Sequence, residues 1–294
     1  MISLNDIQQA DKRISSYIYK TPQVYSNFLS QKNKKFYLKL ESMQITGSFK
    51  LRGAFNKLLC LSKEKKNKGV IAVSTGNHGK GVAYAAKKLG IKSKIFMSKL
   101  VPMHRKSAIE ALGADIVITG KNSDEADFEA RQFAKKNNIS LIHPFDDQQI
   151  IAGQGTIGLE MYKDLPSIDT VIVPTSGGGL IGGIAIALKA FNPNIRVIAV
   201  SMKRGASMYE SLKAGKPVDV IEEETLADCL GGSIGLNNKF TFEIAKETID
   251  DFVLVNEDKI AEGIRLNFSE HRIVTEGAAA TSVMVAKDNL SSQL

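Results

Sequence analysis

Short hydrophobic runs rich in β-branched residues alternate along this chain with longer segments whose hydrophobic residues recur at helical spacing. A short apolar run bounded by turn residues favours a buried strand, whereas a 3.6-residue period favours a helix. The strand-like runs cover residues 36–41, 70–75, 94–98, 115–120, 140–144, 170–175 and 196–201. The helix-like segments cover residues 77–90, 103–113, 123–138, 153–165 and 178–193. This alternation predicts an α/β fold with mostly parallel sheets.

The order of these segments predicts two lobes. Three strand–helix units form a self-contained set between residues 69 and 146, and a second set begins at Thr170. We expect residues 36–41 to join the second set. Residues 69–146 then form a small domain inserted into a large domain made of residues 1–68 and 147–294. Because α/β proteins bind ligands at domain interfaces and at the carboxyl ends of parallel strands, we expect the ligand between the two domains.

Composition and charge narrow the class of protein. The 294 residues are 43% hydrophobic and 24% charged, which excludes a collagen, a disordered tail and a coiled coil. The net charge is 39 − 31 = +8, but the lysines lie in short scattered groups, so we expect a solvated surface and no nucleic-acid partner. The two cysteines, Cys60 and Cys229, have no CxxC spacing, which favours a reducing compartment.

The sequence also predicts a cytoplasmic protein without membrane association. The first residues contain early acidic side chains and no apolar signal-peptide region. One uncharged stretch, from Thr170 to Leu188, is long enough to span a bilayer. It contains five glycines and a proline, so we interpret it as a buried strand, a turn and a helix.

Lys50 is the first candidate catalytic residue. It follows the turn Thr46-Gly47-Ser48-Phe49 and opens a helical segment over residues 51–59. An amine in the first turn lies at the positive end of the helix dipole, which lowers the pKa of the lysine. A lysine that bonds covalently to a carbonyl carbon needs such a lowered pKa. Most single lysines are simply surface charges, so the surrounding motifs have to decide.

Two turns after predicted strands are candidate anion sites. Residues 74–79, Ser-Thr-Gly-Asn-His-Gly, open a helix, and the free N–H groups at a helix start suit a carboxylate or a phosphate. The Asn77 amide can also bind a phenolic or carbonyl oxygen. The alternative is an ordinary turn in which His78 is a structural histidine. Residues 176–183, Ser-Gly-Gly-Gly-Leu-Ile-Gly-Gly, form the second turn, where glycines let the main chain approach an anion closely.

The second turn has an alternative interpretation as a dinucleotide site. Gly177, Gly179 and Gly182 match the GxGxxG spacing. A site for NAD needs an acidic residue after the next strand to bind the ribose, and here Lys203 and Arg204 follow that strand. NAD is therefore disfavoured, and an NADP-binding oxidoreductase that uses Arg204 is a weaker alternative.

Taken together and in this order, TGSFKLRGA, STGNHG and SGGGLIGG resemble the fold-type II pyridoxal-phosphate (PLP) enzymes. This fold is similar to that of the tryptophan synthase β subunit, and the resemblance is to the branch of threonine/serine dehydratases and serine racemases. Further matches are Lys-Leu-Glu at 39–41 with Gln44, His-Pro-Phe-Asp-Asp at 143–147 and Ala-Gly-Gln-Gly-Thr at 152–156. Residues 200–236 are similar to dehydratase-like proteins assigned to hydroxyectoine utilisation.

The resemblance implies a set of site residues. Lys50 would bond covalently to the PLP aldehyde and later remove the substrate's α-proton, and Thr75 would be a second catalytic residue. The remaining cofactor-binding residues would be Phe49, Asn77 at the ring 3-oxygen, Glu276 near the ring, and the phosphate loop Ser176, Gly177, Gly178, Gly179 and Leu180. The substrate carboxylate would be bound by Ser74, Thr75, Gly76, Asn77 and His78.

The implied reaction is β-elimination from a small hydroxy-amino acid such as L-threonine or L-serine, which yields a 2-oxo acid and ammonia. Serine racemases have a serine as the second base where this chain has Thr75, so an amino-acid racemase is the alternative. In similar racemases a Glu and an Asp bind a divalent cation at the positions of Ser201 and Ser207, so we expect no metal there. Because enzymes of this family are usually dimers, the resemblance implies a homodimer.

Two further departures from the pattern of similar enzymes lie at Glu276 and after it. In similar enzymes a proline usually follows this glutamate, whereas this chain has Gly277. Their partner for the pyridine nitrogen lies in a strand and turn further along than Leu294, which is 18 residues after Glu276 (294 − 276). We therefore expect that partner outside this sequence. A chain that lacked it would be a weak enzyme, or a protein that only binds PLP or an amino acid.

Overall fold

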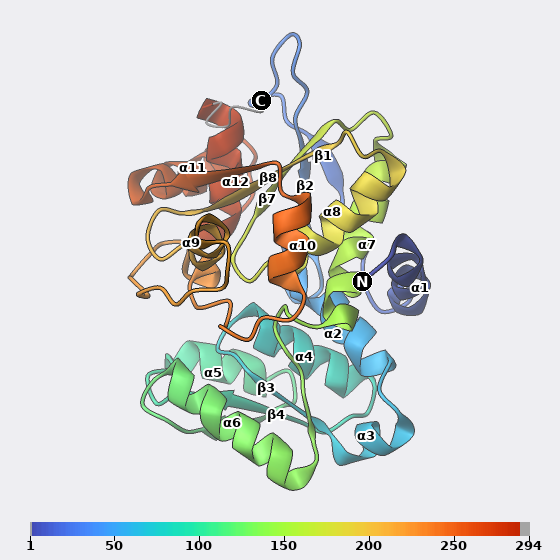
Figure 1. The fold of residues 1–294 in the computed structure, drawn as a ribbon, viewed down its shortest axis with the longest axis vertical. Coiled ribbons are helices and arrows are strands. Elements are labelled where there is room, and N and C mark those ends of the chain that lie inside the picture. The colour runs from blue at the N-terminus through green and yellow to red at the C-terminus, as the bar shows by residue number, and fades with distance from the viewer. Residues whose placement is uncertain (1, 289–294) are drawn as a thin grey trace.

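The computed structural model describes residues 2–288, which form an α/β fold with two parallel sheets (Figure 1). The first sheet has the order β5-β4-β3-β6 and the second has the order β7-β8-β9. The strands of the first sheet are β3 (Val70–Val73), β4 (Ser93–Met97), β5 (Asp115–Ile118) and β6 (Ser140–Leu141). Those of the second are β7 (Thr170–Pro174), β8 (Arg196–Met202) and β9 (Asp251–Val255). The predicted fold class is confirmed.

The helices divide between the two sheets. Those around the first sheet are α3 (Lys63–Lys68), α4 (Asn77–Lys88), α5 (Met103–Glu110) and α6 (Ser123–Asn137), in the lower half of Figure 1. The upper half contains α1 (Leu4–Ile14), α7 (Gln148–Asp164), α8 (Gly179–Phe191), α9 (Ser207–Ala214), α10 (Thr241–Thr248), α11 (Glu257–Ser269) and α12 (Gly277–Asp288). Helix α2 (Lys50–Leu59) contacts both α4 and α7, so it joins the halves. Two short 3₁₀ turns are η1 (Glu41–Met43) and η2 (Asp228–Leu230).

Side-chain caps explain two helix starts that the hydrophobic pattern did not give. Helix α7 begins at Gln148, five residues before the predicted 153, because the Asp147 carboxylate accepts hydrogen bonds from the first backbone N–H groups. Helix α1, absent from the prediction, begins after a capping box in which Ser3 and Asp6 satisfy each other's backbone N–H groups. Both helices therefore start where a side chain replaces the missing intrahelical partner.

Residues 36–41, which we expected to join the second set of elements, do not extend the sheet β7-β8-β9. Strand β2 (Tyr37–Lys39) pairs with β1 (Gln23–Tyr25) as a separate two-stranded antiparallel sheet. The two strands are joined by a hairpin, so they pair locally.

The expected partner of the pyridine nitrogen lies outside the described residues.

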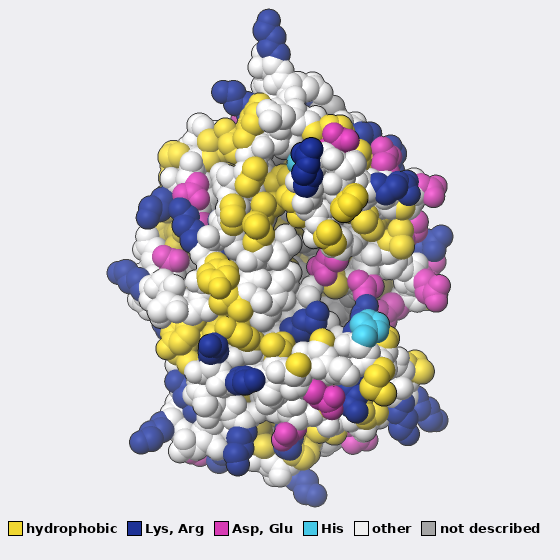
Figure 2. Space-filling view, turned by 180° about the vertical axis from the view of Figure 1, so that it is seen from behind, with side chains coloured by type: hydrophobic (Ala, Val, Ile, Leu, Met, Phe, Trp, Pro, Cys, Tyr) yellow, Lys and Arg dark blue, Asp and Glu magenta, His cyan; other side chains and the backbone are white. Residues whose placement is uncertain are grey.

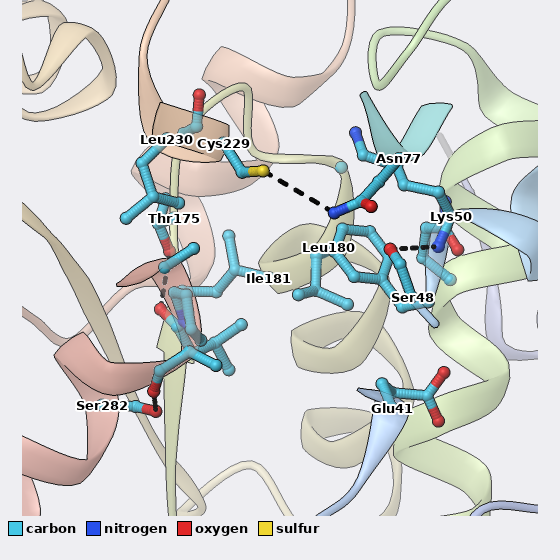
Figure 3. Close-up of a pocket in the computed structure, with 18 of the residues that line it drawn as sticks. Glu41, Ser48, Lys50, Asn77, Thr175, Leu180, Ile181, Cys229, Leu230 and Ser282 are labelled. Atoms are coloured by element: carbon cyan, nitrogen blue, oxygen red, sulfur yellow. Dashed lines mark hydrogen bonds between the residues drawn. The ribbon is translucent and has the colours of Figure 1, made fainter. Parts of the chain in front are cut away.

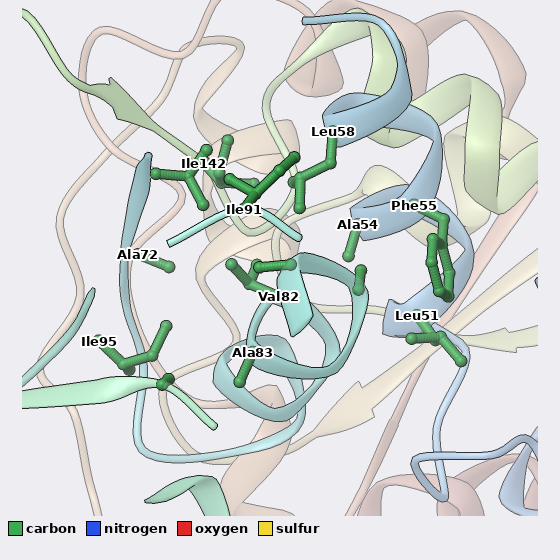
Figure 4. Packing of buried hydrophobic residues seen from close by; sticks show 14 of the residues in the cluster. Leu51, Ala54, Phe55, Leu58, Ala72, Val82, Ala83, Ile91, Ile95 and Ile142 are labelled. Carbon is green, nitrogen blue, oxygen red and sulfur yellow. The ribbon is translucent and has the colours of Figure 1, made fainter. Parts of the chain in front are cut away.

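The largest hydrophobic core packs α2 and α4 against the first sheet. Leu51 and Phe55 of α2, Val82 of α4 and Ile95 of β4 are fully buried in it (Figure 4). A second core lies between α8 and the strands β7 and β8. Helix α2 thus buries one face against the first sheet's layer while its other side faces α7.

Glycines let α2, α7 and α8 cross at very short distances. A Cβ on Gly153 of α7 would lie 2.6 Å from the Cα of Gly53 of α2. On the other side of α7, a Cβ on Gly155 would lie 2.8 Å from the carbonyl oxygen of Gly183 in α8. These contacts are backbone against backbone, so no side-chain rotation can relieve them. The three helices therefore form one tightly packed layer.

A buried network of ion pairs holds α2 in place against its neighbours. The guanidinium of Arg52 has no exposed surface and is bound by the carboxylates of Glu41 and Glu160 at 2.7–3.0 Å. Glu160 also accepts a hydrogen bond from Lys39 at 2.6 Å. A buried charge is tolerated only when it is paired and fully hydrogen-bonded. Arg52 therefore ties α2 to α7 and to the segment that follows β2.

The surface agrees with the scattered charge seen in the sequence. On the face shown in Figure 2, Lys and Arg side chains lie apart, many at the outline, and do not gather into one patch. Within residues 2–288, no helix has the length and apolar content that crossing a bilayer requires. The uncharged stretch from Thr170 to Leu188 forms β7, a turn and most of α8, as predicted.

The close helix crossing predicts a large effect of one methyl group. Gly153→Ala should lower the free energy of unfolding by about 1–3 kcal/mol, because the added Cβ meets backbone atoms that cannot move independently. The control is Gly182→Ala in α8, where the Cβ meets only side-chain atoms, the γ2 methyl group of Ile244 at 2.9 Å and its Cβ at 3.7 Å. Urea unfolding of both variants checks this; equal losses of stability would contradict it.

Candidate active site

A cavity of about 1840 Å³ lies between the two parallel sheets. It opens at the carboxyl ends of β3 and β7, where the chain turns into α4 and α8. The predicted site residues all line this cavity: Phe49, Lys50, Ser74, Thr75, Gly76, Asn77, His78, Ser176, Gly177, Gly178, Gly179, Leu180 and Glu276. The fold therefore brings together four segments that are far apart in the sequence.

Lys50 supplies a buried amine to the cavity. Its Nζ donates a hydrogen bond to the carbonyl oxygen of Pro144 at 2.8 Å and lies 5.3 Å from the ring centroid of Phe49. Burial lowers the pKa of Lys50 to about 8, and the negative charge of Glu276 partly opposes this shift. The sequence predicted a lowered pKa from the helix dipole, and in the structure removal of the amine from water lowers it.

The glycine run begins helix α8 without a side-chain cap. Gly178, the N-cap residue, has φ +84°, a left-handed conformation that favours glycine. Gly177 and Gly179 pack on Phe145, where Cβ atoms would lie 2.3 Å and 3.0 Å from it. Because no side chain caps the helix, its first N–H groups remain as donors for an anion.

The turn Ser74 to His78, in the other half of the molecule, also leads into a helix that no side chain caps. Helix α4 begins at Asn77 after the N-cap Gly76, again without a side-chain cap. The Ser74 hydroxyl accepts a hydrogen bond from the Gly76 N–H at 3.1 Å, which shapes the turn. Thr75 between them is half-buried and lines the cavity.

His78 has its imidazole turned into the protein. Its Nε2 bonds to the carbonyl oxygen of Ile142 at 2.8 Å, and burial lowers its pKa to about 3, so the ring is neutral. This is the structural histidine that the sequence left open as an alternative. His78 can still offer its backbone N–H to the cavity, but its side chain serves the core.

Glu276 and Asn77 meet at the rim of the cavity, together with one residue that the sequence did not single out for the site. The Asn77 Nδ2 donates to both carboxylate oxygens of Glu276, at 2.9 Å and 3.1 Å. The thiol of Cys229 in η2 donates to Glu276 Oε2 at 3.2 Å. Figure 3 shows Cys229 and Asn77 pointing toward one another, with Lys50 beside Asn77. No local motif marks Cys229, because its distance from Glu276 depends on the tertiary fold.

Ser201 and Ser207, the positions discussed for a divalent cation, are both buried. Ser207 Oγ accepts a hydrogen bond from the Ile234 N–H at 3.1 Å, and Ser201 Oγ contacts the sulfur of Met202. Within residues 2–288, no cluster of three or more His, Cys, Asp or Glu side chains could hold a metal ion. The absence of a metal stays a prediction.

The residues present fit the PLP that the sequence resemblance implies. A phosphate needs several N–H donors at close backbone approach, and the uncapped start of α8 offers them. An aldehyde needs an amine that loses its proton near neutral pH, and Lys50 with its pKa of about 8 is such an amine. Both lie in the same cavity, which also has the volume for a cofactor together with a small substrate.

The buried amine predicts a stability that depends on pH. The pKa of Lys50 is about 8 in the folded chain and 10.5 unperturbed, so the unfolded chain binds more protons between these values and stability rises with pH. Below pH 8 the free energy of unfolding of the ligand-free Lys50→Met variant should exceed that of the wild type by roughly 3 kcal/mol. This difference should disappear as the pH approaches 10.5. Urea unfolding across this range measures the gap; a constant difference would contradict the expectation.

Comparison with known proteins gives a consistent picture. The family model described as "Pyridoxal-phosphate dependent enzyme" matches residues 14–294. A putative threonine dehydratase from Sinorhizobium fredii is 46% identical over 283 residues, covering 96% of this chain and 85% of the relative. The catabolic L-threonine dehydratase TdcB from Staphylococcus aureus is 43% identical over 282 residues, covering 95% and 81%.

The similarity extends to solved structures. Maize serine racemase superposes with a TM-score of 0.92 at 32% identity, covering 99% of this chain and 87% of that chain. The predicted cofactor is thereby confirmed as PLP, and the family match favours it over the NADP alternative. The chain belongs to the family of pyridoxal-phosphate dependent enzymes.

Proposed function

We propose that this chain is an ammonia-lyase that converts a small hydroxy-amino acid, such as L-threonine or L-serine, into a 2-oxo acid and ammonia. The observation that carries the proposal is the buried amine of Lys50 between two uncapped helix starts. Relatives named threonine dehydratase, at 43–46% identity over nearly the whole chain, support this choice of reaction.

When bound, PLP withdraws electrons from the substrate's α-carbon and so makes the α-proton acidic. Lys50 acts as the base that takes this proton. Its lowered pKa keeps a fraction of the amine unprotonated near neutral pH, which a base needs. Loss of the β-hydroxyl group as water, followed by hydrolysis of the nitrogen-bearing product, gives the 2-oxo acid and ammonia.

The two helix starts hold the two anions of the reaction. The loop Ser176–Leu180 binds the cofactor phosphate, and the loop Ser74–His78 binds the substrate carboxylate through backbone N–H groups. Phe49, Asn77 and Glu276 face the cofactor ring. In this proposal residues 69–146 form the substrate-binding domain, and residues 1–68 and 147–294 form the cofactor-binding domain.

We also propose that the chain works as a cytoplasmic homodimer. Apolar side chains lie exposed near the loop between α11 and α12, with Phe268 67% and Val274 80% accessible. Phe28 of the β1–β2 hairpin packs edge-on against His271 of that loop and is itself exposed. An exposed apolar area of this kind is typical of a protein–protein interface.

A substrate panel tests the proposed reaction. The purified full chain with PLP should release 2-oxo acid and ammonia in equal amounts from L-threonine or L-serine. Lys50→Ala should abolish both this activity and the near-visible absorption band of the lysine-bound cofactor, because it removes the amine. A Lys50→Ala protein that retained wild-type turnover would contradict the assignment of Lys50.

Amino-acid racemisation is the second candidate function. The observation in its favour is Thr75, whose hydroxyl-bearing side chain lines the cavity in the turn before Asn77. A racemase needs a second proton donor on the face of the substrate opposite the lysine. The similarity to maize serine racemase supports this candidate at the level of the fold and the family.

Thr75 variants separate the two functions. If elimination dominates, Thr75→Ala should retain 2-oxo acid production within about tenfold, because Lys50 alone removes the α-proton. If racemisation contributes, D-serine should form from L-serine and vanish in Thr75→Ala, while Thr75→Ser keeps it. Chiral chromatography of the amino-acid pool measures both outcomes.

A further inference from the structure

The segment Leu226–Cys229 crosses the rim of the cavity between α9 and α10. Its entry is fixed by α11, because the Thr225 hydroxyl and the Leu226 N–H both donate to the Glu257 carboxylate at 2.8 Å. Its end is the start of η2, which contacts α12. The segment therefore runs directly beside the residue pair Glu276 and Gly277.

Gly277 is what allows this close approach. A Cβ on Gly277 would lie 2.1 Å from the carbonyl oxygen of Leu226 and 3.0 Å from the backbone nitrogen of Ala227. Both are backbone atoms, so any larger residue at position 277 would push the segment away from the start of α12. Gly277, which stands where similar enzymes usually have a proline, therefore lets the segment around Leu226 pack directly against the start of α12.

The close approach brings Cys229 to the carboxylate of Glu276. Glu276 Oε2 accepts hydrogen bonds from the Cys229 thiol at 3.2 Å and from the Asn77 amide at 2.9 Å. A carboxylate only accepts, so the amide nitrogen of Asn77 is the atom that faces it, and the orientation of the Asn77 side chain is fixed. Two donors on one oxygen likewise restrict rotation of the carboxylate.

The segment is also attached to the half of the molecule that carries the first sheet. Asp228 forms an ion pair with Arg105 of α5, while Asn77 belongs to α4. The side chains of Arg105 and Asp228 are 39% and 45% exposed, so this pair contributes little by itself. Cys229 and Glu276, in contrast, both line the cavity itself.

We propose that the Leu226–Cys229 segment is a positioning element of the site: seated on Gly277, it uses the Cys229 thiol to hold Glu276 against Asn77. The role it gives to Asn77 and Glu276 during turnover rests on the proposed function. The contact itself is a property of the chain and can be tested separately. Cys229 touches no reacting atom in this proposal and acts through Glu276.

The state of the thiol agrees with a donor role. Burial, followed by the charges of Glu276 and Asp228, raises the pKa of the Cys229 thiol well above its ordinary value. The group therefore stays protonated at neutral pH and donates, and it is a poor nucleophile. Cys229 still faces the cavity and remains accessible to a small reagent.

Alkylation by iodoacetamide measures the contact without any turnover. On the full chain as purified, mass spectrometry follows Cys229 and Cys60, the matched exposed cysteine. Glu276→Gln removes the neighbouring charge and should speed modification of Cys229 at least about tenfold, with Cys60 unchanged. Gly277→Ala should also speed Cys229, because it displaces the segment. A Cys229 rate that matches the wild type in both variants would overturn the proposal.

Activity and the cofactor spectrum test the consequence. Cys229→Ala should lower kcat about tenfold and alter the absorption of bound PLP, and Cys229→Ser should restore both, because a hydroxyl can donate in place of the thiol. Cys60→Ala, outside the site, should stay within about twofold of the wild type. Wild-type kcat and spectrum in Cys229→Ala would overturn the positioning role. If the wild type itself made no 2-oxo acid, the proposed function would fail while the alkylation rates still decided the contact.

Discussion

The burial of one guanidinium determines where the rest of the site can be. Arg52 has no exposed surface, and its charge is tolerated only because Glu41 and Glu160 bind it from two sides. These partners belong to η1 and α7, so α2 can occupy only one position relative to both. Lys50 begins the same helix two residues earlier, and its amine is thereby carried into the cavity. A structural ion pair thus sets the place of the buried amine.

An uncapped helix start lies on each side of the Lys50 amine. Helix α4 follows a strand of the first sheet and α8 follows a strand of the second, and each starts after a glycine N-cap with no side-chain cap. Both starts lie at the carboxyl ends of parallel strands, where such sheets place their ligands. The two helix starts therefore present free backbone N–H groups on both sides of one lysine.

The electrostatics of the cavity balance two opposing effects on Lys50. Removal from water disfavours its ammonium form and lowers its pKa, while the negative charge of Glu276 acts in the opposite direction. The result, a pKa of about 8, leaves the amine able both to lose and to regain a proton near neutral pH. Residues at the rim therefore tune the lysine without touching it.

Local sequence determined much of this protein. The alternating hydrophobic runs predicted the strands of both parallel sheets up to β8, and the three glycine-containing motifs pointed to Lys50 and to the two turns that line the same cavity. These features are local, since each depends on neighbouring residues in the chain. The pairing of β2 with β1 and the inward orientation of the His78 ring were decided by hydrogen bonds that the hydrophobic pattern does not encode. The early start of α7 depends on the Asp147 side-chain cap, a local signal that the hydrophobic pattern alone leaves out. The meeting of Cys229 with Glu276 depends on a backbone contact at Gly277 between segments some fifty residues apart in the chain (276 − 229 = 47). Only the tertiary structure could reveal it, because the contact requires both segments to be packed first.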